Sequence, residues 1–128
     1  NTFISYNFAE VPGFSKFGSY TGNGNADGPF VYTGFKPAFV LIKNSSQNNG
    51  WWQMTDNARN PFNVVEKAIF SNVTDSEYDS GNYATDFVSN GFKLRNSTAG
   101  SNVNGDVYIY MAFGQTIVGT NNIPNNAE

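Results

Sequence analysis

The sequence contains no cysteine and no histidine among its 128 residues. Without cysteine the chain has neither a disulfide framework nor a thiolate nucleophile. Without histidine it lacks the most frequent general base of enzymes and the most frequent protein ligand of metals. The commonest forms of nucleophilic and metal-assisted catalysis are therefore excluded.

Charge is also scarce. Charged residues make up 13% of the chain, against about 25% in an ordinary soluble domain. The net charge is −3, and no run of lysine or arginine occurs, which argues against nucleic acid and anionic membranes as partners. No apolar run approaches the roughly 18 residues of a membrane span, so we expect no membrane insertion. The chain opens at Asn1 rather than at methionine, and we expect a processed product or a piece of something longer.

Aromatic residues, asparagine and glycine are abundant instead: twelve Phe, seven Tyr, two Trp, twenty Asn and thirteen Gly. This composition is typical of short strands joined by tight turns. The length predicts one domain, placed at residues 1–118, that buries roughly two-thirds of its unfolded surface. Residues 119–128 are predicted to form a polar tail.

Hydrophobic alternation and four Asn-Gly turns predict about nine strands and no secure helix. Residues 37–43 are almost continuously apolar, as in a central strand covered on both faces. Residues 63–70 are predicted to be irregular, with at most one helical turn, and the glycine-rich residues 22–29 to form a hairpin loop rather than a phosphate cradle. The predicted fold is all-β, an antiparallel β-sandwich of jelly-roll or lectin-like type. The main strands are expected at residues 3–11, 14–21, 30–32, 37–43, 51–55, 83–89, 91–95 and 106–113.

The stretch from Asn49 to Asn63 holds both tryptophans. If Trp51 and Trp52 lie on a strand, they point to opposite faces, and one of them is then available to stack on a sugar ring. Asp56 and Arg59 are expected to form an ion pair that holds the following turn, or else to act with Asn57 as a ligand clamp. A buried or interfacial role for both tryptophans is the alternative.

Two other groups of acidic residues are candidates for a metal site or a catalytic pair. Asp75, Glu77 and Asp79 alternate before Gly81 and form the best candidate for Ca²⁺, although the EF-hand pattern is not met and a solvated acidic loop is the favoured interpretation. No other cofactor is expected. A glycosidase-type carboxylate pair would have to come from Asp27, Asp56, Glu66 and Asp86, whose spacing favours no pair, so we expect no enzyme.

Residues 4–11 align with residues 109–116, with Ile4 over Ile109 and Phe8 over Phe113. The start of the chain therefore resembles the end of a preceding unit of the same kind, although two strands can match this loosely by chance.

The chain as a whole resembles a family of β-rich domains in virion proteins of tailed bacteriophages, many of them marine. The resemblance covers about residues 3–115. Its parts are residues 13–24 (GFSKFGSYTGNG), 27–38 (DGPFVYTGFKPA), 51–63, 87–95 (FVSNGFKLR) and 108–113 (YIYMAF).

That resemblance implies a place in a tail-fibre, tail-tip or head-decoration protein, on the virion surface or in an extracellular fibre. Such units usually run on into further chain, whereas this sequence stops at a polar tail. We expect a non-enzymatic structural module that assembles with copies of itself and with other virion proteins. Phe3, Tyr6, Tyr108 and Tyr110 are the expected contact residues, on end strands whose unpaired edges invite a partner. The alternative is a carbohydrate-binding module that recognises host surface glycan through Trp51 or Trp52.

Overall fold

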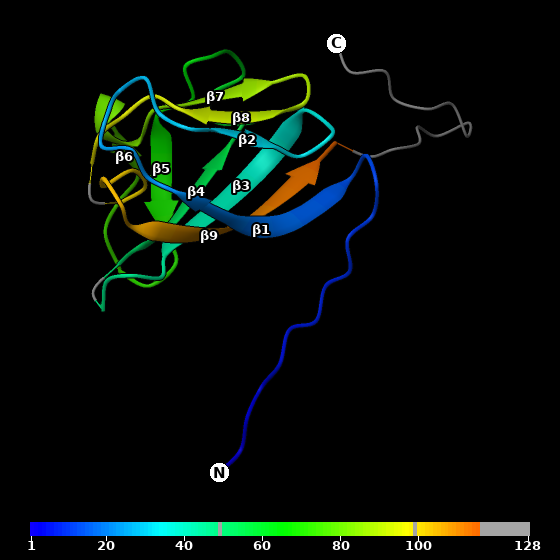
Figure 1. The fold of residues 1–128 in the computed structure, drawn as a ribbon. Helices are drawn as coiled ribbons and strands as arrows, with labels where there is room; N and C mark the ends of the chain where they lie inside the picture. The colour runs from blue at the N-terminus through cyan, green and yellow to red at the C-terminus, as the bar shows by residue number, and fades with distance from the viewer. Residues whose placement is uncertain (49, 99, 116–128) are drawn as a thin grey trace.

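A computed structural model describes residues 1–48, 50–98 and 100–115. Within them the chain forms nine strands and one 3₁₀ turn (Figure 1). The predicted boundary at residue 118 and the tail at residues 119–128 lie outside the described residues. In chain order, the elements are β1 (Ser15–Thr21), β2 (Phe30–Tyr32), β3 (Pro37–Asn44), β4 (Trp52–Asp56), β5 (Lys67–Phe70), β6 (Tyr78–Asp79), η1 (Gly81–Tyr83), β7 (Thr85–Val88), β8 (Gly91–Leu94) and β9 (Val107–Gly114).

The strands form two antiparallel sheets that pack face to face. The larger has six strands in the order β1-β9-β3-β4-β5-β6, and the smaller has three in the order β2-β8-β7. Figure 1 shows the smaller sheet lying across one face of the larger. The all-β, antiparallel sandwich prediction is confirmed, with the strands divided six and three.

The hydrophobic core lies between the sheets. Tyr108 and Tyr110 of β9 point into it, together with Val40 and Ile42 of β3 and Phe92 of β8. Tyr20 stacks on Tyr108 with ring centroids 5.2 Å apart, and Tyr110 meets Phe92 edge-on at 5.3 Å. Burial raises the pKa of Tyr20 well above its ordinary value, and its hydroxyl donates to the carbonyl of Ser101 at 2.6 Å.

Asparagine side chains hold the loops at one end of the sandwich. Asn102 is fully buried. Its amide nitrogen donates to Asn23 Oδ1, Asn25 O and Asn96 O at 2.7–3.1 Å, and its Oδ1 accepts from the backbone N–H of Asn23. One side chain thus satisfies polar groups of two loops, the one between β1 and β2 and the one between β8 and β9, which explains part of the heavy use of asparagine.

Three sequence predictions of local structure need correction. Residues 1–10 form no strand, and regular pairing begins only at Ser15. Residues 22–29 join β1 to β2, which belong to different sheets, so the segment is a crossover rather than a hairpin loop. The segment at residues 63–70 ends in strand β5, because its last residues pair with β4.

No helix in the described part of the chain is long and apolar enough to cross a membrane.

Candidate functional site: the outer face of the six-stranded sheet

One apolar row crosses five strands on the side of the large sheet that faces away from the core. Phe17 of β1 pairs with Met111 of β9, and Met111 pairs with Leu41 of β3. Leu41 pairs in turn with Met54 of β4, and Met54 with Ile69 of β5. Directly paired residues share one face of a sheet, so the five side chains form a continuous band.

Neighbouring rows extend this band. Ile109 lies between Ser19 and Lys43, and Lys43 pairs with Trp52. Phe113 lies beside Phe39 in the row on the other side. We call the resulting surface the outer face. It consists of Phe17, Phe39, Leu41, Trp52, Met54, Ile69, Val107, Ile109, Met111 and Phe113.

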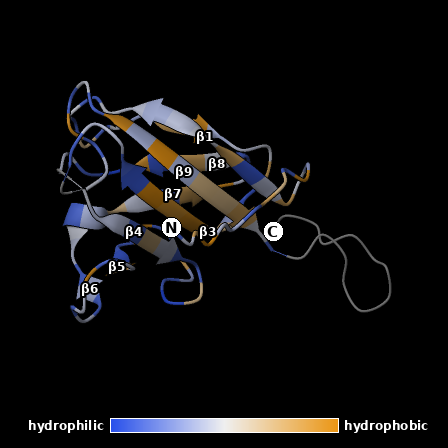
Figure 2. Ribbon diagram, turned by 90° about the horizontal axis from the view of Figure 1, so that it is seen from below, coloured by the Kyte–Doolittle hydropathy of each residue, from blue (hydrophilic) through white to orange (hydrophobic). Residues whose placement is uncertain are grey.

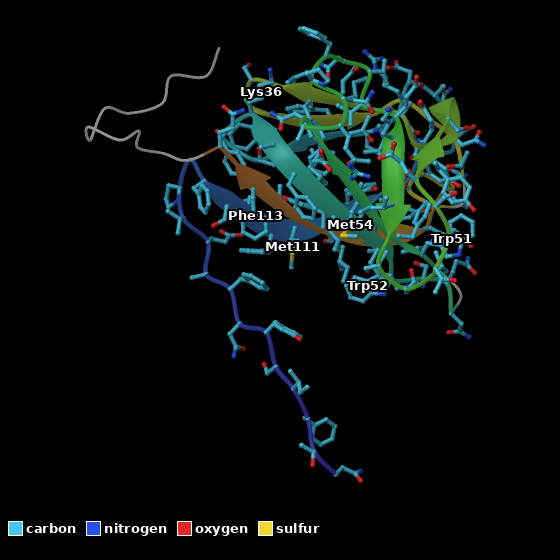
Figure 3. All side chains as sticks on the ribbon, turned by 180° about the vertical axis from the view of Figure 1, so that it is seen from behind. Lys36, Trp51, Trp52, Met54, Met111 and Phe113 are labelled. Carbon is cyan, nitrogen blue, oxygen red and sulfur yellow. The ribbon has the colours of Figure 1, made fainter. Side chains whose placement is uncertain are left out.

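The outer face is only partly shielded from solvent. Ile109 is 45% exposed and Trp52 39%, and the row from Phe17 to Met54 is half-buried. A hollow of about 260 Å³ lies at its centre, lined by Phe17, Leu41, Trp52, Ile109 and Met111, with Gly18 and Tyr110. Figure 3 shows the labelled Trp52, Met54, Met111 and Phe113 along this side of the sheet. Residues 37–43 are thus covered by protein on one face only.

An antiparallel sheet with one face on the core normally carries polar residues on the other. The outer face departs from this rule, and Figure 2 shows that many residues of β3 and β9 are hydrophobic.

The outward side of the small sheet is mixed: Phe30 and Tyr32 are exposed there, and Phe30 pairs with the charged Lys93. Lys93 on β8 binds Asp27 at 2.9 Å, and Arg95 bridges Asp27 and Asp86. Lys93 and Arg95 also lower the pKa of Asp27. Asp27 and Asp86, two of the carboxylates weighed for catalysis, therefore share an arginine.

The two tryptophans differ in their surroundings. Trp51 packs against Phe70 at 4.8 Å and Tyr78 at 6.4 Å, in a second aromatic cluster that includes Tyr83. Trp52 lies on the outer face, where it lines the hollow. The structure thus makes Trp52 the accessible one.

Asp56 and Arg59 form the predicted ion pair. Arg59 binds Asp56 Oδ2 at 2.6 Å through Nε, and the backbone N–H groups of Ala58 and Arg59 donate to Oδ1 at 3.0 and 2.9 Å. Partial burial raises the pKa of Asp56, but the Arg59 guanidinium and these N–H groups outweigh it and hold the pKa below its ordinary value. Arg59 also donates to the carbonyl of Met54. The pair fastens the turn after β4.

The predicted sugar clamp is not assembled around Trp52. Asp56 lies four residues further along β4, about 14 Å away at the rise of an extended strand. Its oxygens are occupied by Arg59 and the turn. Asn57 belongs to that same turn, and its N–H donates to the carbonyl of Ala38. Trp52 has apolar neighbours in the hollow instead.

The acidic group at residues 75–79 engages other side chains. Asp75 accepts a hydrogen bond from the Tyr78 hydroxyl at 2.9 Å, and this bond raises the pKa of Tyr78. Glu77 contacts Arg59 at 3.3 Å and Lys67 at 3.7 Å. Asp79 is exposed on β6. Nowhere in the described residues do three or more His, Cys, Asp or Glu side chains gather closely enough to hold a metal ion.

The predicted contact residues divide into two pairs. Phe3 and Tyr6 are 86% and 81% exposed. Tyr108 and Tyr110 are buried in the core, so the expectation that they contact another subunit is wrong. Both faces of β9 are apolar, and alternation alone does not tell which one the small sheet covers. The apolar outer face was not predicted from the sequence. The continuous apolarity of residues 37–43 was the available signal, because it places apolar side chains on both faces of β3.

The chain belongs to a family described as "Domain of unknown function (DUF7483)", whose model matches residues 1–116. No curated protein and no solved structure matches the chain.

Proposed function

We propose that this chain is a non-enzymatic structural module of a phage virion or a related extracellular fibre, and that it assembles with identical copies through the outer face. The observation that carries the proposal is the apolar row from Phe17 to Ile69 across five strands. A contiguous exposed apolar surface of this kind marks an interaction site on soluble proteins.

The composition of the outer face fits a protein interface. Aromatic residues and methionine are enriched at the centres of such interfaces, whereas Lys, Asp and Glu are depleted. The two charged side chains that pair directly with residues of the outer face, Lys43 and Asp56, are held by their own chain. Lys43 Nζ donates to the carbonyl of Gly50 at 2.7 Å, and Asp56 binds Arg59. Covering the face would therefore bury few unsatisfied charges.

The non-enzymatic part of the proposal is supported by what the carboxylates do. Three of the four carboxylates named above for glycosidase-type catalysis, Asp27, Asp56 and Asp86, contact lysine or arginine side chains. General acid catalysis by a carboxyl group needs a raised pKa, whereas the pKa values of Asp27 and Asp56 are lowered. Placement in a virion or fibre rests on the sequence resemblance given above.

The proposal is tested by placing a lysine on each sheet in turn. Ile109→Lys puts a charge on the outer face at a position that is 45% exposed. Tyr32→Lys is the matched control, because Tyr32 is 64% exposed on the small sheet. We expect Ile109→Lys to weaken self-association at least tenfold in sedimentation velocity, with Tyr32→Lys unchanged. Equal self-association of both variants would refute the outer face as the interface.

Carbohydrate recognition is the second candidate, favoured by the exposure of Trp52 beside the hollow. Glycan arrays with the native chain, Trp52→Ala and Trp51→Ala separate the two functions. A receptor module binds a defined glycan and loses it with Trp52→Ala alone. A structural module binds none.

A further inference from the structure

The first ten residues form an arm that extends from the rim of the outer face. All ten are exposed, and Ile4, Tyr6 and Phe8 alternate with Ser5 and Asn7 as in a strand. Figures 1 and 3 show the arm leading away from the large sheet on its outer side. Covering large exposed apolar side chains with a partner removes apolar surface from water, which lowers the free energy.

The base of the arm is fastened to β1. The Ser15 hydroxyl donates to the carbonyl of Ala9 at 3.0 Å and accepts from the N–H of Val11 at 2.8 Å. Glu10 binds Lys16 at 2.9 Å and accepts from the N–H of Phe17 at 3.1 Å. These contacts fix the direction in which residues 1–7 leave the domain, away from their own sheet.

The arm begins where the outer face begins. Phe8 packs against Phe17 and Phe113 with ring centroids 6.0 and 5.9 Å apart. An arm residue thus already occupies the margin of the apolar surface. The family model includes residues 1–116, so the arm is part of the unit that defines the family.

The hollow suits side chains better than a free ligand. Its volume of about 260 Å³ lies below the roughly 300–1,000 Å³ of small-molecule pockets, and its lining is apolar. Residues 3–7 in extended form reach about 17 Å, and the distance from β1 across β9 and β3 to β4 is about 14 Å. The arm is therefore long enough to cross the hollow from one side to the other.

We propose that the arm of one copy docks across the outer face of a second copy, with Ile4 and Tyr6 in the hollow beside Met111. A two-fold axis makes the exchange reciprocal, because each copy then gives an arm and receives one. The inference rests on the proposed self-association and names the segment that mediates it. It also gives the exposed aromatic residues of the arm a partner.

Because the chain contains no cysteine, introduced cysteines are the only thiols, and disulfide cross-linking can test the proposal. Chains carrying Tyr6→Cys are mixed with chains carrying Met111→Cys and oxidised, and the products are analysed by mass spectrometry. We expect a disulfide between the two different chains. The control replaces the second partner with Tyr32→Cys, on the small sheet, and we expect cross-linking at least tenfold slower there.

A double variant with Tyr6→Cys and Met111→Cys in one chain tests whether the arm closes on its own face. An internal disulfide that forms with the same yield at any dilution would overturn the proposal. Cross-linking of Tyr6→Cys that is no faster to Met111→Cys than to Tyr32→Cys would overturn it as well. If the native chain still self-associates in that case, the arm proposal alone fails. If the native chain is a monomer, both proposals fail.

Discussion

The ring of Phe8 lies against the ring of Phe113 with centroids 5.9 Å apart and planes inclined by 64°. Phe8 lies near the base of the exposed arm, and Phe113 lies on β9, the strand between β1 and β3 in the large sheet. This contact joins the exposed apolar side chains of the arm to those of the outer face. It also connects the beginning of the described chain to its last strand.

Replacing Phe8 by alanine tests whether this contact holds the base of the arm. Aromatic pairs in this geometry contribute about 0.5–1.5 kcal/mol each beyond their buried area. We expect Phe8→Ala to leave the core intact and to accelerate amide exchange at Phe17, whose N–H donates to Glu10. Unchanged exchange at Phe17 would show that the hydrogen bonds of Glu10 and Ser15 hold the base without Phe8.

Truncating two neighbouring residues of β9 should affect different properties: the stability of the single chain for Tyr110, and mainly its self-association for Ile109. Tyr110→Ala removes a buried core ring and should cost about 3–5 kcal/mol of unfolding free energy. Ile109→Ala on the outer face should cost less than half as much in the dissociated chain, yet weaken self-association. Denaturant unfolding of both variants at low concentration measures the first effect, and sedimentation velocity the second. Equal stability losses would mean that both faces of β9 are packed within one chain.

We expect the hydrogen bonds of the Asn102 side chain to contribute more to stability than those of any other polar side chain in the loops at its end of the sandwich. Asn102→Ala removes the partner of the buried Asn96 carbonyl and of two part-buried backbone groups, the Asn23 N–H and the Asn25 carbonyl, and a buried polar group left without a partner costs about 1–3 kcal/mol. We expect a loss of at least about 2 kcal/mol in urea unfolding. Asn104→Ala is the control at an exposed position and should change stability by less than about 0.5 kcal/mol. Similar losses in the two variants would contradict a special role for Asn102.

The Asp56–Arg59 pair makes part of the stability depend on pH. The folded pKa of Asp56 is lowered, so its contribution is complete above the ordinary aspartate pKa of about 3.9 and is lost as the pH falls through the folded value. We expect Asp56→Asn to lose about 1 kcal/mol at pH 7, a modest figure because the pair is partly exposed. The native chain should lose more stability than Asp56→Asn between pH 5 and pH 2. Parallel pH curves for the two proteins would contradict this.

The sequence predicted those parts of the fold that depend on local pattern. The Asn-Gly turn at residues 90–91 and the alternation in residues 106–113 gave β7, β8 and β9 nearly at their observed bounds. The alternation at residues 3–11 equally suits a strand, but a strand also needs a neighbour. No strand of the described chain pairs with residues 3–10, and Val11 makes only an isolated bridge to Ser15.

The outer face could not be recognised because alternation shows that two faces exist and not which one is covered. The pattern alone therefore predicts Tyr108 and Tyr110 as contact residues, whereas the structure buries both and exposes the side of β9 that carries Ile109 and Met111. Burial on β9 depends on where the small sheet lies, which no local pattern encodes. The Asp56–Arg59 pair was predictable, because its two residues lie three positions apart at a turn before Pro61.

The most direct test of the central proposal is the mass of the native chain in solution, measured by light scattering over a wide range of concentrations. Assembly through the outer face predicts at least twice the chain mass of 14.0 kDa, and a shift toward the single chain with Ile109→Lys. A native chain that stays at 14.0 kDa at every concentration would contradict assembly as the function of this surface.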